Sequence, residues 1–132
     1  MESVLAAAQL DVPGCLAAGY VNIPTGTLVC AGSVDTAQRD ALGAAARAAP
    51  GLFDPRPVAD LARFFGEAAT SPEASSTLSE AVFLTDEMIH VYQRSRVDPA
   101  HALVVVCRRS ANIGMAIARA RLALPRVEAV SA

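Results

Sequence analysis

The side chains of this chain that could do chemistry are three cysteines and two histidines. Cys15, Cys30 and Cys107 each lie in an apolar, strand-like stretch and none belongs to a C-x-x-C pair, which favours small buried core residues over a zinc site. His90 and His101 belong to no recognisable nucleophile or metal motif. We expect His90 to face solvent from a strand and His101 to lie in a turn.

The remaining candidates for catalysis are two adjacent carboxylates. Asp86 and Glu87 form a compact turn signal between two strand-like stretches, where neighbouring carboxylates point apart and stay solvated, so a raised pKa is not expected. Neither G-x-x-x-x-G-K-[ST] nor G-x-G-x-x-G is present. We therefore predict a protein that is not an enzyme, with no catalytic residue, no cofactor and no metal.

Composition limits the partners. A chain of 132 residues is long enough for one domain, and we expect residues 1–132 to form it. Eleven basic and thirteen acidic residues give a net charge of -2, which supplies no basic footprint for nucleic acid. No stretch reaches the ~18 uncharged apolar residues of a membrane span, and the first residues lack the basic region of a secretory signal. We expect a cytoplasmic protein without membrane insertion.

The first third of the chain predicts a helix and a hairpin. A short helix is expected over residues 3–10. Two apolar stretches, residues 14–22 and 27–34, flank the turn sequence IPTG and predict an antiparallel pair of strands. Gly19 and Gly32 within these stretches indicate a bulge, or a helix packed closely against that face.

The second helical region is predicted to be interrupted. Asp35 and Gln38 form a capping box at its start, and Pro50 ends the first helical run. Pro55 fits the first turn of a second run. The interruption should therefore lie near Pro50 to Pro57.

The second of these runs presents one apolar face. The residues that share it, at helical spacing, are Val58, Leu61, Ala62 and Phe65. Phe64 lies beside this stripe. Both a core position and an exposed, partner-binding position are open for Phe64.

The second half of the chain predicts three strands. Residues 67–79 are rich in Ser, Thr and Ala and should form a flexible loop. Residues 80–85 and 88–94 read as two strands joined by a tight turn, and alternation in the second indicates one polar face. Residues 102–107, ALVVVC, do not alternate, which predicts a central strand covered on both faces.

A helix should follow this central strand directly. Ser110 or Asn112 can offer a side-chain oxygen to the free amides at its start, and Gly114 should let the helix approach the sheet backbone. Residues 125–132 are expected to be a C-terminal tail. The element order predicts an α+β fold, layered α/β/α, with an antiparallel five-stranded sheet in the order α-β-β-α-β-β-β-α.

This order, and above all the stretch ALVVVCRRSANIGMAIARARLAL at residues 102–124, resembles the roadblock/dynein light chain family and its bacterial roadblock-type domains. The matching features are an apolar strand, a short turn, an Asn-x-Gly that contains Asn112 and Gly114, and a small-residue helix. Two features depart from the family: the hairpin sequence NIPTG and the interrupted second helix. Both bear on the geometry of a dimer.

The resemblance implies a noncatalytic homodimeric adaptor or regulator that binds a small Ras-like GTPase or a signalling scaffold. It implies dimerisation through the second helix and the third strand, whose unpaired edge could pair with a copy of itself. The expected dimer or partner interface comprises Leu42, Ala46, Arg63, Phe64, Val82, Phe83 and Leu84.

Two other functional classes stay open at this point. One is a small-molecule-sensing module of profilin-like or PAS-like shape, with an apolar cavity lined by Tyr20, His90 or Tyr92. The other is an acidic, dimeric secretion chaperone that would bind an unfolded effector segment.

Overall fold

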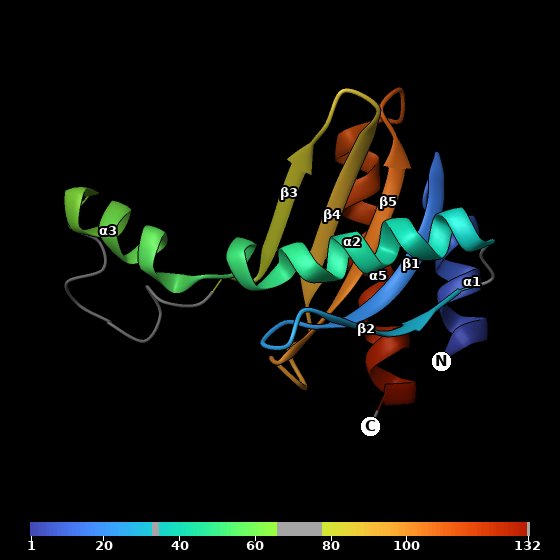
Figure 1. Cartoon of the computed structure of the whole chain (residues 1–132), viewed down its shortest axis with the longest axis horizontal. Coiled ribbons are helices and arrows are strands. Elements are labelled where there is room, and N and C mark those ends of the chain that lie inside the picture. The colour runs from blue at the N-terminus through green and yellow to red at the C-terminus, as the bar shows by residue number, and fades with distance from the viewer. Residues whose placement is uncertain (33–34, 66–77, 132) are drawn as a thin grey trace.

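Five antiparallel strands form one sheet with helices on both faces (Figure 1). The computed structural model describes residues 1–32, 35–65 and 78–131. Its elements are α1 (Glu2–Asp11), β1 (Cys15–Asn22), β2 (Thr27–Ala31), α2 (Thr36–Leu52), α3 (Pro55–Phe65), β3 (Glu80–Leu84), β4 (Met88–Arg94), β5 (His101–Arg108) and α5 (Ile113–Ser131). The strand order is β2-β1-β5-β4-β3. The predicted α+β class and element order are confirmed. The loop expected over residues 67–79 lies outside the described residues, apart from its last two.

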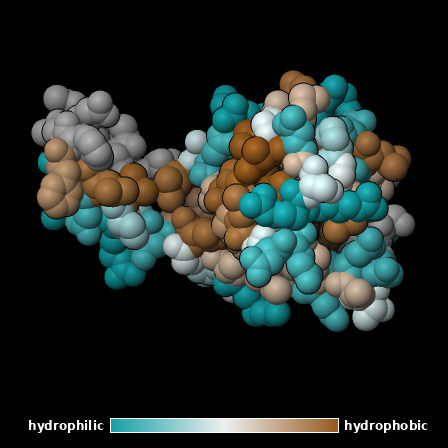
Figure 2. All heavy atoms as spheres, turned by 90° about the horizontal axis from the view of Figure 1, so that it is seen from above, coloured by the Kyte–Doolittle hydropathy of each residue, from teal (hydrophilic) through white to brown (hydrophobic). Residues whose placement is uncertain are grey.

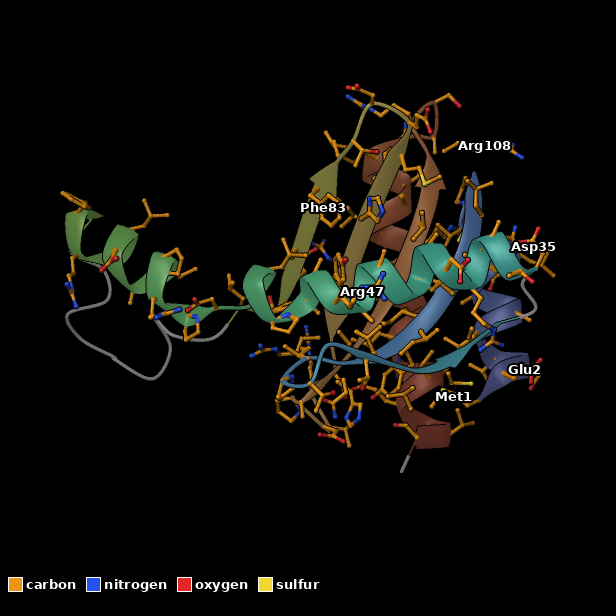
Figure 3. The ribbon with its side chains drawn as sticks, viewed as in Figure 1. Met1, Glu2, Asp35, Arg47, Phe83 and Arg108 are labelled. Carbon is orange, nitrogen blue, oxygen red and sulfur yellow. The ribbon has the colours of Figure 1, made fainter. Side chains whose placement is uncertain are left out.

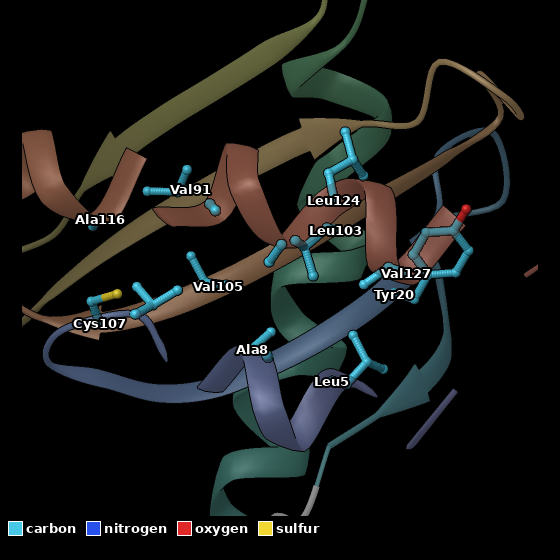
Figure 4. Close-up of a cluster of buried hydrophobic side chains, with 14 of the residues drawn as sticks. Leu5, Ala8, Tyr20, Val91, Leu103, Val105, Cys107, Ala116, Leu124 and Val127 are labelled. Atoms are coloured by element: carbon cyan, nitrogen blue, oxygen red, sulfur yellow. The ribbon is translucent and has the colours of Figure 1, made fainter. Parts of the chain in front are cut away.

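The strand β5 is the centre of the sheet, between β1 and β4. Its residues 102–107 are all buried, because alternate side chains enter two different cores. Leu103, Val105 and Cys107 join the core under α1 and α5, which Figure 4 shows. The other three point to the core under α2. The prediction that this strand is covered on both faces is therefore confirmed.

Small residues let the helices approach the sheet closely. Gly32 follows β2, and a Cβ there would lie 3.0 Å from the backbone nitrogen of Ala6 in α1. A Cβ on Gly19 in β1 would lie 3.3 Å from the Leu42 side chain of α2. The register of β1 against β2 also shifts just beyond Gly19. The close packing of a helix against these glycines is confirmed, whereas the bulge lies between Tyr20 and Val21 and includes neither glycine.

The β4 strand does not have the polar face that its alternation suggested. His90 is 9% exposed and Tyr92 is fully buried. The Tyr92 hydroxyl donates a hydrogen bond to the Ala45 carbonyl of α2, with 2.8 Å between the oxygens. Because α2 crosses this side of the sheet and accepts the hydrogen bond of the phenol group, Tyr92 can be buried although its side chain is polar. The solvent-facing position predicted for His90 is therefore wrong.

The interruption between α2 and α3 is confirmed, within the predicted range from Pro50 to Pro57. Asp35, labelled at the start of α2 in Figure 3, accepts from the Gln38 amide at 2.8 Å. The helix then continues through Pro50 to Leu52. A proline this close to the helix end removes one hydrogen bond and leaves the remaining turns intact. Asp54 accepts from the Arg56 amide at 2.9 Å and begins α3.

The C-terminal helix differs from prediction in two places. Residues 125–131, expected to be a tail, continue α5, and Val127 is fully buried; its burial compensates for the bond lost at Pro125. Gly114 is exposed, and a Cβ there would touch only the Asn112 side chain, so its expected role in close packing is wrong. The Asn112 cap is confirmed, because its side-chain oxygen accepts from the Met115 amide at 3.0 Å.

Candidate interaction surface

The strand β3 ends the sheet and, among the described strands, pairs only with β4. The Thr85 amide donates to the Met88 carbonyl at 2.9 Å. Since alternate residues of an antiparallel strand bond to the same neighbour, the odd-numbered residues of β3 face β4. The backbone groups of Glu80, Val82 and Leu84 therefore point to the open side, and we call these three residues the β3 edge. The side chains of Val82 and Leu84 are also exposed.

The helix α3 extends from the body of the molecule beside the C-terminal end of α2 (Figure 1), and we call Pro55–Phe65 the α3 arm. Two of its apolar side chains are exposed, Leu61 by 59% and Phe64 by 86%. Figure 2 shows apolar residues along the arm as far as the body. Of the two positions open for Phe64, the structure shows the exposed one. Arg63 is exposed and pairs with Asp60 at 3.5 Å.

Two of the expected interface residues are core residues. Leu42 and Ala46 are both fully buried in the core between α2 and the sheet, so they cannot contact a partner while this fold persists. The outward side of α2 instead exposes Asp40, Ala44 and Arg47. Helical periodicity indicated a buried stripe, but only the position of the sheet shows which stripe is covered.

A groove runs between α2 and the turn that joins β3 to β4. It has a volume of about 440 Å³ and is lined by Ala41, Ala44, residues 85–88 and His90. Phe83, labelled in Figure 3, stacks on the His90 ring with 4.1 Å between centroids. Burial lowers the pKa of His90, and its Nδ1 has no hydrogen-bond partner in the described part of the chain. The imidazole is therefore held neutral at pH 7.

The other titratable candidates have structural roles. His101 begins β5, and its Nδ1 lies 2.7 Å from a carboxylate oxygen of Asp98. Its ring also stacks on Tyr20 with 5.2 Å between centroids. Asp86 and Glu87 are exposed in the predicted turn. Within residues 1–32, 35–65 and 78–131, no three His, Cys, Asp or Glu side chains converge as metal ligands.

A second, polar groove of about 520 Å³ lies between β4 and α5, where the sequence predicted no site. The Arg121 guanidinium pairs with Glu80 at 2.5 Å and lowers the pKa of that carboxyl. At the other end, Glu128 accepts from the Ser95 hydroxyl at 2.9 Å and from the Val97 amide at 3.0 Å. These pairs join residues far apart in the sequence, so no local pattern could have indicated them.

The three side chains proposed for a ligand cavity do not share one. Tyr20 belongs to the core under α1 and α5, whereas Tyr92 belongs to the core under α2, on the other face of the sheet. His90 lines the open groove beside α2. None of the helices described is both long and apolar enough to cross a membrane.

Comparisons with solved structures identify the fold. A Roadblock/LC7 domain from Streptomyces avermitilis superposes with a TM-score of 0.67 at 15% identity, over 98% of this chain and 96% of that one. MglB of Myxococcus xanthus superposes with a TM-score of 0.67 at 14% identity, and the match covers 98% of this chain and 92% of MglB. The gliding protein MglB of Thermus thermophilus superposes with a TM-score of 0.64 at 18% identity, and the match covers 94% of this chain and 84% of that protein. No family model and no curated protein matches the chain.

The chain therefore has the roadblock/LC7 fold, as the resemblance at residues 102–124 implied. The likeness extends over nearly the whole chain.

Proposed function

We propose that this protein is a noncatalytic homodimeric adaptor that binds a small Ras-like GTPase or a signalling scaffold. The observation that supports it most is the β3 edge, a strand edge whose Val82 and Leu84 side chains are exposed and which no other described strand pairs with. Soluble proteins usually protect such an edge, and pairing with a second copy is one way to do so. One solved neighbour, with a TM-score of 0.64 at 15% identity, is described as MglB with a tetrameric arrangement.

The geometry of β3 suits pairing about a two-fold axis. Val82 is its central residue, and its backbone N–H and C=O point away from β4. An antiparallel copy of β3 would therefore bond to Val82 and to its neighbours on the edge, and one sheet would run through both protomers. Val82 and Leu84 side chains of the two copies would cover one another, which removes apolar surface from water.

The outward side of α2 borders the groove at the β3–β4 turn and would complete the dimer contact in this proposal. Ala44 is exposed there and also lines the groove beside His90. A small side chain at this position allows a second helix to approach closely. Asp40 and Arg47 are also exposed on α2. If two copies of this helix lie antiparallel, Asp40 of each copy can pair with Arg47 of the other.

The α3 arm is the proposed contact with the GTPase or scaffold. It is an exposed helix with apolar side chains, Leu61 and Phe64, beside a basic one, Arg63. Such a helix fits a hydrophobic groove on a partner, because apolar anchors supply affinity and a rim charge guides orientation. Arg63 acts as a rim charge in this proposal. It has no assigned role in nucleotide hydrolysis, which belongs to the GTPase.

Two measurements test the proposal. Gel filtration with light scattering at high micromolar concentration should give twice the chain mass, and a strict monomer would contradict the dimer. Binding is then measured by interferometry to a purified small Ras-like GTPase, loaded with GDP or with a nonhydrolysable GTP analogue. Binding that prefers one nucleotide state supports the adaptor. Copurification with an unfolded effector segment, without binding to the GTPase, would instead favour the secretion chaperone.

A further inference from the structure

Two of the three cysteines face each other across the central strands. Cys15 in β1 is the register partner of Cys107 in β5. The Arg108 amide donates to the Gly14 carbonyl at 2.9 Å, while the Cys15 amide donates to the Val12 carbonyl at 3.1 Å. This pattern makes Cys15 and Cys107 a non-hydrogen-bonded pair, in which opposite Cα atoms lie about 4.5 Å apart. That separation is within the range of disulfide bonds.

The two sulfurs also lie on the same side of the sheet. Cys107 is fully buried in the core under α1 and α5, where Figure 4 shows its sulfur, and Cys15 packs against that core while remaining partly exposed. The Cys15 thiol can donate its one proton to the Ala17 carbonyl, 3.3 Å from its Sγ, or to the Cys107 sulfur. The contact between the sulfurs raises the pKa of Cys15 and lowers the pKa of Cys107.

The third cysteine provides a comparison within the same chain. Cys30 in β2 lies opposite Tyr20, five residues along β1 from Cys15. At the rise of a β-strand this is about 16 Å, so Cys30 cannot form a disulfide with either of the others without rearrangement of the backbone. Only one pair in the chain therefore has disulfide geometry.

We propose that Cys15 and Cys107 form a reversible redox modification site, which closes to a cross-strand disulfide when the protein meets hydrogen peroxide. One sulfur, as its thiolate, attacks a peroxide oxygen; the O–O bond breaks, water leaves, and a sulfenic acid forms. The second sulfur then attacks the sulfenic sulfur, and its proton leaves with the hydroxyl group as a second water. In total, two thiols lose two electrons and two protons, and one peroxide becomes two waters. A dithiol reductant reverses the step by exchange.

The disulfide would hold together two turns that are already in contact, the turn before β1 and the turn between β5 and α5. A Cβ on Gly14, just before β1, would lie 2.7 Å from the Ala111 side chain in the turn between β5 and α5. Closing the bond next to this contact fixes the start of β1 against the entry to α5. It also closes a loop that spans residues 15–107, which restricts the unfolded chain. This inference is independent of the proposed adaptor function.

Peptide mapping of the full-length protein tests the assignment. The protein is treated with hydrogen peroxide, alkylated without reduction and digested with trypsin. Because the first arginine is Arg39, Cys15 and Cys30 share the peptide 1–39, whereas Cys107 lies in the peptide 97–108. We expect these two peptides to be linked in the native chain and in Cys30→Ala. The link should be absent in Cys15→Ala, which leaves the buried Cys107 in place.

Thermal unfolding gives a second readout. Oxidised Cys30→Ala should melt roughly 5 to 15 °C above its reduced form, because a disulfide that closes a long loop stabilises a domain of this size by that order. Dithiothreitol should abolish the difference, and Cys15→Ala should show none. Three outcomes would overturn the proposal: a link through Cys30, cross-links between chains, or sulfinic and sulfonic acids without an internal disulfide.

Discussion

The His90 imidazole lies parallel to the Phe83 ring, with 4.1 Å between centroids and 8° between planes. The stack joins the last strand of the sheet to its neighbour, because Phe83 is on β3 and His90 is its register partner on β4. It also borders the groove beside α2. A titratable ring thus supports the strand that carries the proposed dimer edge.

Protonation of His90 should weaken the fold. Its folded pKa lies below the ordinary value of 6.5, and burial is the cause, so the unfolded chain takes up the proton first. The stability that depends on neutral His90 is complete above about pH 6.5 and decreases as the pH falls towards the folded pKa. Urea unfolding between pH 7.5 and 5 should show this loss, and His90→Phe, which keeps the stack, should reduce it. An unchanged slope in the variant would exclude His90 as the cause.

Two glycines should respond in opposite directions to the same substitution. Gly32→Ala places a Cβ 3.0 Å from the α1 backbone, whereas Gly51→Ala in α2 meets nothing within 4 Å. We expect Gly32→Ala to cost about 1–3 kcal/mol through overpacking. Gly51→Ala should stabilise by up to about 1 kcal/mol, since alanine has the better helix propensity. Denaturant midpoints at a constant m-value measure both, and equal effects would show that α1 does not pack closely on Gly32.

Phe64→Arg should separate partner binding from stability. The side chain is 86% exposed, so the free energy of unfolding should change by less than about 0.5 kcal/mol. If the α3 arm is the partner contact, affinity for the GTPase or scaffold should fall by at least about tenfold, the loss typical of an apolar anchor. Arg63→Ala, at a rim position, should have a much smaller effect. Unchanged affinity in Phe64→Arg would place the contact elsewhere.

Local sequence signals predicted much of this fold because the interactions behind them are local. The capping box at Asp35 and the Asn112 cap each join residues three positions apart. The unbroken apolar stretch of β5 required cover on both faces and therefore a central position. These features do not depend on where other segments pack.

Several of the failures concern which segment covers which face. His90 and Tyr92 resembled the outward residues of an alternating strand, but Tyr92 is buried under α2 and His90 is buried against the Phe83 ring. Leu42 and Ala46 were assigned to an interface but are buried in the core. An apolar stripe on a helix does not reveal whether the protein's own sheet or a partner covers it. Pairs such as Arg121 with Glu80 link distant elements and have no local pattern.

The β3 edge can be tested by one substitution that leaves the internal ladder intact. The Val82 amide points away from β4, so Val82→Pro removes a donor only from the open side. The same change at Phe83, whose backbone faces β4, would break the sheet itself. Val82→Thr, which keeps the amide and the β-branched shape, is the matched control.

Light scattering on these Val82 variants measures the central claim directly. The native chain and Val82→Thr should elute at twice the chain mass at high micromolar concentration, and Val82→Pro should elute as a folded monomer with an unchanged far-UV circular dichroism spectrum. A dimer that persists in Val82→Pro, or a native chain that is itself monomeric, would contradict association through β3.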